Sequence, residues 1–175
     1  MFDLTHEQYE EKIHEWDEKD AAGPIMPEEE LKAAIEEFIK ANDTFALATG
    51  NDGYVRCTPI EYIYSNGAFL LFTEGGKKFI GLEKNKKVSA ALFDKFSGWN
   101  TLKGLQIQGT AQIIEPMSEE YMKACGEKKI PAEAIKKMPR PLNIIKIVPE
   151  EMMFLNAAFK EKGYASRQAL KCCNT

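Results

Sequence analysis

The chain has 175 residues, of which 44% are hydrophobic and 29% are charged, and its formal net charge is −4. This size and composition predict one soluble globular domain with a substantial core, and the negative charge argues against a nucleic-acid partner. No apolar run is long enough to span a bilayer, and the acidic, polar N-terminus is unlike a secretory signal. We therefore expect a cytoplasmic protein with no membrane partner.

The four cysteines agree with a reducing compartment. Cys57, Cys125, Cys172 and Cys173 show no C-x-x-C spacing, which argues against a zinc site or a thioredoxin-like motif, so we predict no bound metal. Free thiols are the expectation in such a compartment. Cys172 and Cys173 are expected on a mobile tail, with a redox role as the less favoured alternative.

Two helices are predicted before the first strand. Residues 5–20 form the first, with Thr5 and Gln8 at capping-box spacing, and Gly23-Pro24 follows it as a break. The second covers 27–41, because Pro27 and three glutamates suit its beginning. Its apolar residues recur at i, i+4, i+7 and i+8, which predicts one buried face: Leu31, Ile35, Phe38 and Ile39.

The chain then becomes rich in β-forming residues. Six strands are predicted, at 44–49, 54–64, 68–73, 87–93, 102–114 and 143–148, with 152–155 continuing or following the last. Pro59 predicts an edge position or a bulge for the second strand. Short helices are expected at 77–84 and within 118–138, and residues 157–175 are expected to be irregular or briefly helical. Six strands joined largely by hairpins predict a closed or nearly closed β-barrel with helices at its rim.

The turn after the third strand has the sequence Gly75-Gly76-Lys77-Lys78. Two lysines at the beginning of a helix are unusual, since each opposes the helix dipole by about 0.3–1 kcal/mol. The arrangement suits a bound anion, which free N–H groups, the dipole and the lysines would all attract. A pair of solvated lysines after a flexible turn explains these residues equally well.

The ordered series of elements resembles the FMN-binding split-barrel family typified by pyridoxamine 5′-phosphate oxidase. The resemblance covers roughly residues 28–155 and rests on a series of segments: Ala48-Thr49, 55–60, Phe72-Thr73, Lys77-Lys78, 85–93 and 106–109. It implies a mainly β fold, namely a six-stranded Greek-key split β-barrel with flanking short helices. It also implies a homodimer with two FMN molecules at the subunit interface.

The resemblance further implies which residues contact the cofactor. Family positions that bind the phosphate fall on Arg56, Lys77 and Lys78. Positions beside the isoalloxazine ring fall on Cys57, Thr58, Pro59, Ile60, Phe72 and Thr73. A family glutamine near the ring aligns with Gly104, and Gln106 is the next residue along that face. No catalytic residue is identified.

Three departures from the oxidase concern its substrate. Glu61 stands where the oxidase has a lysine that meets substrate, and the C-terminal Arg-x-His motif has no match in the segment 156–160. The only histidines, His6 and His14, lie outside the matching region. We therefore expect a substrate other than pyridoxamine phosphate.

The sequence predicts three parts: an N-terminal helical extension (1–26), an FMN-binding split-barrel domain (27–156) and a C-terminal tail (157–175). The favoured function is an FMN-dependent oxidoreductase acting on a small molecule, with NADH or NADPH as a candidate reductant. Two alternatives stay open: a non-catalytic flavin- or haem-binding protein for sensing or storage, and a barrel that binds a phosphorylated metabolite without flavin. Trp99 is expected to pack against the protein rather than to cover the flavin.

Overall fold

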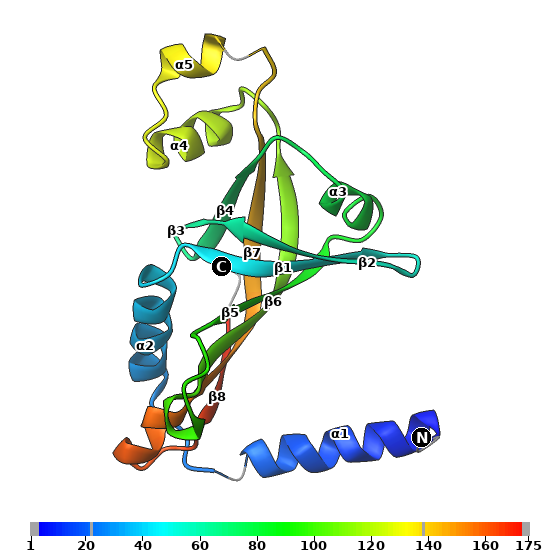
Figure 1. Ribbon diagram of the computed structural model, residues 1–175, viewed down its shortest axis with the longest axis vertical. Helices are drawn as coiled ribbons and strands as arrows, with labels where there is room; N and C mark the ends of the chain where they lie inside the picture. The colour runs from blue at the N-terminus through cyan, green and yellow to red at the C-terminus, as the bar shows by residue number, and fades with distance from the viewer. Residues whose placement is uncertain (1–3, 22, 138, 173–175) are drawn as a thin grey trace.

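The computed structural model describes residues 4–21, 23–137 and 139–172. Its centre is a curled, antiparallel, eight-stranded sheet in the order β2-β1-β5-β6-β7-β4-β3, with β8 paired to β7 (Figure 1). Its strands are β1 (Thr44–Asn51), β2 (Tyr54–Glu61), β3 (Ile63–Ser65), β4 (Ala68–Thr73), β5 (Lys87–Phe93), β6 (Lys103–Ile114), β7 (Asn143–Asn156) and β8 (Arg167–Lys171). Because β2 and β3 end the sheet, the barrel is split, as predicted.

The inner face of the sheet carries the main core. Side chains alternate between the faces of a strand, and on β1 and β6 the buried residues include Phe45, Leu47, Leu105 and Ile107. Helix α2 (Glu28–Lys40) covers this face with the apolar stripe predicted from its spacing. The stripe is anchored by Phe38, whose ring stacks on that of Phe154 with centroids 5.2 Å apart.

A second, smaller core lies on the other face of β4, β6 and β7. Helices α4 (Glu119–Glu127) and α5 (Ala132–Lys137) cover that face, and both lie at one end of the molecule (Figure 1). Ser118 begins α4 as predicted, because its hydroxyl accepts a hydrogen bond from the Tyr121 N–H at 3.1 Å. The buried residues of this cluster are Leu70, Ile114, Tyr121, Ala124, Cys125, Ile135 and Ile144.

Helix α1 (His6–Ala21) projects away from the sheet (Figure 1). Its predicted capping box is present, since the Thr5 N–H donates to Gln8 Oε1 at 2.9 Å and the Gln8 N–H donates to Thr5 Oγ1 at 3.3 Å. Residues 5–15 are all exposed, in keeping with the polar sequence of this segment.

The C-terminal segment differs from the prediction. A short 3₁₀ helix, η2 (Ala157–Lys162), is followed by β8, a strand that was not predicted from the sequence. The strand is held by Gln168, whose buried amide donates to the carbonyls of Pro24 (3.1 Å) and Ala165 (2.8 Å) and accepts from the Met26 N–H (3.0 Å). Five residues with a single large apolar side chain, Leu170, give too weak an alternation to predict a strand.

Three further expectations need correction. The long β segment 54–64 is divided at Tyr62 into β2 and β3, and the helix expected at 77–84 is the single turn α3 (Lys78–Gly81). Cys172 is not on a mobile tail, because it packs against the core and its N–H donates to the Glu150 carbonyl at 2.8 Å. Cys173 lies outside the described residues. The edge position predicted from Pro59 is confirmed, since β2 ends the sheet.

Candidate functional site

Helix α3 is held tightly against the sheet beside β1 and β2. The chain turns out of β4 through Gly75 and Gly76, whose φ angles of 147° and 105° lie in a region that favours glycine. At the other end of α3, a Cβ atom on Gly81 would lie 2.6 Å from Thr49 Oγ1, so only glycine allows this close approach. The turn and the close contact together fix the position of Lys78.

Lys78 is a buried cation without an acidic partner. Lys78 is only 7% exposed, and its ammonium donates to Thr73 Oγ1 at 2.8 Å and to the Gly75 carbonyl. No carboxylate in the described part of the chain forms an ion pair with it. Burial lowers the pKa of Lys78, and the positive charge of nearby Arg56 lowers it further. A bound anion would compensate both charges.

Strands β1 and β2 each add an unpaired hydroxyl group on the inner face of the sheet. Arg56 lies opposite Thr49 and Thr58 opposite Leu47, so these side chains share the inner side of the sheet. The hydroxyls of Thr49 and Thr58 are buried and have no hydrogen-bond partner among the residues that the structure describes. Such groups are costly unless something else satisfies them, which makes this region suitable for a polar ligand.

Two residues near this cluster were not predicted. Thr49 could have been suspected from a polar residue at a buried position of an otherwise apolar strand. Tyr54 has no such signal, yet its hydroxyl donates to the Lys77 carbonyl at 3.3 Å and so links β2 to the beginning of α3. The side chain of Lys77 itself is exposed.

The other predicted contact residues do not all lie on this face. Ile60 is on the inner side and packs against the main core. Cys57 and Pro59 are exposed on the outer side, opposite Ala48 and Ala46. Ala46 pairs with Ala91, and Ala91 with Gln106, so an outer row of residues crosses four strands: Pro59, Ala46, Ala91 and Gln106.

Phe72 lies on the opposite face of β4 from Thr73, beside α4. The ammonium of Lys128, just after α4, sits 5.0 Å from the Phe72 ring centroid and 3.0 Å from Glu61 Oε2. Glu61, the acidic residue at the end of β2, is therefore neutralised by a lysine from a different element. Lys128 was not predicted, because only the fold brings residues 61 and 128 together.

Three further observations concern Trp99, metal binding and membrane spans. Trp99 is 80% exposed, so the expected packing is wrong; its ring lies edge-on to that of Phe96, with centroids 5.7 Å apart. Among the described residues no cluster of three or more His, Cys, Asp or Glu could hold a metal ion. Within the same residues, no helix combines the length and apolarity needed to cross a membrane.

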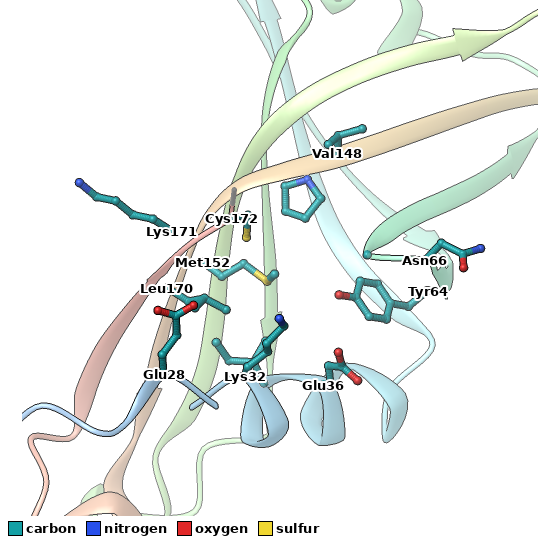
Figure 2. A pocket seen from close by; sticks show the side chains of 13 residues that line it. Glu28, Lys32, Glu36, Tyr64, Asn66, Val148, Met152, Leu170, Lys171 and Cys172 are labelled. Carbon is teal, nitrogen blue, oxygen red and sulfur yellow. The ribbon is translucent and has the colours of Figure 1, made fainter. Parts of the chain in front are cut away.

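A separate cavity of about 460 Å³ lies between α2, the strands β3, β7 and β8, and the turn that follows β3 (Figure 2). It is lined in part by Lys32, Tyr64, Met152 and Leu170. None of the residues predicted to bind the cofactor lines this cavity, so it is distinct from the cluster around Lys78.

Solved structures with the same fold include proteins named for different ligands. An FAD-binding protein from Mesorhizobium loti is 19% identical with a TM-score of 0.56, covering 69% of this chain and 89% of its own. The haem storage protein HutZ from Vibrio cholerae is 18% identical with a TM-score of 0.56, covering 69% and 90%. A putative pyridoxamine 5′-phosphate oxidase from Listeria innocua is 16% identical with a TM-score of 0.56, covering 72% and 98%.

These identities are low, so the solved structures establish the fold alone. No curated protein matches the chain. The family model described as pyridoxamine 5′-phosphate oxidase matches residues 31–156, which include the whole sheet except β8. The chain therefore belongs to the pyridoxamine 5′-phosphate oxidase family.

Proposed function

We propose that this protein binds FMN, with its phosphate on Arg56 and Lys78, and acts as an oxidoreductase on a small molecule. The observation that carries the proposal is the buried ammonium of Lys78, which lies near a second cation and has no acidic partner among the described residues. Burial and the positive charge of Arg56 disfavour the charged form of Lys78, and a phosphate dianion would favour that form again.

The remaining residues of the cluster would position the cofactor. Thr73 holds the Lys78 ammonium at 2.8 Å, and the unpaired Thr58 hydroxyl would donate to or accept from the ligand. Bound FMN would supply the capacity to accept and pass on electrons, with NADH or NADPH as the candidate reductant. The protein's own contribution is binding and orientation, since no side chain of the cluster is an obvious general acid or base.

A homodimer with a shared site is part of this proposal. One subunit presents Thr58 and Lys78 on the inner side of the sheet but Cys57 and Gln106 on the outer side. A ligand that touched both groups would have to cross the free edge of β2 or lie between two subunits. The outer side also exposes large apolar residues, Val55 at 79% and Phe93 at 66%, which a partner would cover.

The substrate is proposed to be something other than pyridoxamine 5′-phosphate. Glu61 places a negative charge where the oxidase family has a lysine, and its partner Lys128 neutralises that charge instead of leaving a free cation. We expect negligible pyridoxal 5′-phosphate formation by the FMN-loaded protein in an assay that uses a genuine oxidase as the positive control. Glu61→Lys alone should not restore it, because the C-terminal donors would still be missing.

The test of the phosphate site is a flavin fluorescence titration of matched lysine variants. Lys78→Ala should weaken FMN binding by roughly tenfold to hundredfold, the effect of losing one charge-assisted contact of about 1.5–3 kcal/mol. Lys84→Ala is the matched control, because Lys84 is exposed and pairs only with Asp52. Equal affinity in the two variants would refute the assignment.

A non-catalytic flavin- or haem-binding role is the second candidate, supported by the similarity in fold to a haem storage protein. The pigment that co-purifies with the protein distinguishes the candidates. Released FMN, bleached by NADH or NADPH with turnover, supports the oxidoreductase, and FMN that is not bleached supports a carrier. Released haem supports storage, and a colourless protein that binds phosphorylated metabolites supports a flavin-free module. We retain a cytoplasmic location as part of the proposal.

A further inference from the structure

The cavity between α2 and the sheet has the size of a small-molecule site. Its volume of about 460 Å³ lies within the range of roughly 300–1,000 Å³ that is usual for ligand pockets. It is formed by segments distant in sequence: α2, the turn between β3 and β4, and the region where β7 meets β8 (Figure 2). The cavity shares no lining residue with the proposed FMN site.

The walls of this cavity are largely apolar. Ile35, Met152 and Leu170 line it and are 1%, 4% and 7% exposed. The ring of Tyr64 forms a further wall, fixed by its contact with the Phe69 ring at a centroid distance of 4.8 Å. A hydrocarbon chain placed among these side chains would leave water without losing any hydrogen bond.

Two hydrogen-bond donors are directed into the cavity. Figure 2 shows the Tyr64 hydroxyl and the Lys32 ammonium pointing into the space above α2. Neither group has a hydrogen-bond or ion-pair partner in the described ranges. Burial raises the pKa of Tyr64, and the charge of Glu36 raises it further, so its hydroxyl keeps its proton and can donate at neutral pH.

The two acidic side chains of the rim are placed differently. Glu36 lies at the same end as Tyr64 (Figure 2), and its carboxylate is engaged by Lys40 at 2.8 Å. Glu28 lies beside Leu170, at the end of the cavity away from Tyr64 (Figure 2). The unpaired donors are therefore concentrated at one end, and the apolar side chains lie between that end and Glu28.

We propose that this cavity binds a small aliphatic monocarboxylate, with the carboxylate on Lys32 and Tyr64 and the chain over Met152 and Leu170. The carboxylate would accept hydrogen bonds from both groups, of which Lys32 is exposed and Tyr64 is half-buried, and the hydrocarbon matches the apolar walls. Such a ligand would bind independently of FMN, because the two sites share no residue.

The test is calorimetric titration of the purified protein with octanoate, octan-1-ol and octylammonium. Octanoate should bind most tightly, and its affinity should rise by about fourfold for each methylene added from hexanoate to octanoate. The Met152 methyl signal in a proton–carbon NMR spectrum should shift on titration and so locate the ligand. Saturating FMN should leave the octanoate affinity unchanged.

Substitutions distinguish the contribution of the charged and hydroxyl groups to binding from that of the apolar walls. Lys32→Met keeps most of the apolar stem and should lower octanoate affinity by about tenfold, with little change for octan-1-ol. Tyr64→Phe should cost about threefold, and the exposed control Lys95→Met should cost nothing. The proposal is overturned by no binding at millimolar concentration, by an unmoved Met152 signal, by tighter binding of octylammonium, or by equal losses for octanoate and octan-1-ol in Lys32→Met.

Discussion

Helices α3 and α4 each bring a lysine to β4, but the two lysines differ in what surrounds them. Lys78 bonds to Thr73 on one face of β4, is buried, and lies near another cation. Lys128 lies over Phe72 on the other face and is paired with Glu61 at 3.0 Å. The paired lysine is satisfied within the protein, whereas the unpaired one is explained best by an external anion. The absence of an acidic partner among the described residues therefore indicates a ligand site better than the lysine alone does.

Charge substitutions provide the strongest test of this comparison. Lys78→Glu should lower FMN affinity by about a hundredfold or more, because it removes a cation and adds a repulsive charge near the phosphate. Lys128→Gln should change FMN affinity by less than about threefold, since it removes only one end of a partly exposed pair. Flavin fluorescence titration measures both affinities, and similar losses would show that the two lysines contribute equally to FMN binding.

The two helices also differ at their glycines. Gly81→Ala would place a Cβ 2.6 Å from Thr49 Oγ1, whereas Gly126, within α4, has open space around its Cβ position. Gly81→Ala should therefore lower the free energy of unfolding by about 1–3 kcal/mol, and Gly126→Ala should raise it by about 0.5–1 kcal/mol. Urea denaturation of both variants compares them directly. A neutral Gly81→Ala would mean that α3 can move away from β1 freely.

The pH dependence of FMN binding sharpens the assignment of Lys78. Its pKa lies below the ordinary value of 10.5 in the free protein, so on raising the pH it loses its proton earlier than an exposed lysine does. Because a phosphate binds the charged form, FMN affinity should fall as the pH rises through the lowered pKa of Lys78, before exposed lysines lose their protons. Lys78→Ala should lack this part of the decrease. Titrations at fixed ionic strength measure it, and parallel curves for the two proteins would contradict the assignment.

The smallest effect is expected at the ion pair between Glu61 and Lys128. Glu61→Ala should lower the free energy of unfolding by less than about 1 kcal/mol, because the side chain of Glu61 is 64% exposed and surface pairs contribute little. The loss should shrink further at high salt. A double-mutant cycle with Lys128→Ala measures the coupling, and a coupling above about 2 kcal/mol would show that this pair also acts as a buried interaction.

Most of the strands, though not β8, and helix α2 were predictable because their patterns are local. The alternation in 102–114 and the stripe from Leu31 to Ile39 each specify one buried face. The proposed anion site was half predictable: Gly75-Gly76-Lys77-Lys78 pointed to it, but the preference for a bound anion over solvated lysines rests on the burial of Lys78. The Glu61–Lys128 pair and the cavity beside Tyr64 depend on which distant elements meet, and no spacing in the sequence encodes that.

Gln168 has a consequence for where the chain can be cut. Its amide joins β8 to the segment from Pro24 to Met26, which are 142 or more positions away in sequence. Deleting residues up to Ala21 would spare these bonds, whereas a protein beginning at residue 28 would leave a buried amide short of two partners. Each unsatisfied group costs about 1–3 kcal/mol. The useful starting point for a shortened version or an N-terminal fusion is therefore Gly23. Proteolytic cleavage just after Met26 would weaken the hold of the segment 24–26 on β8, and so would destabilise both terminal segments at once.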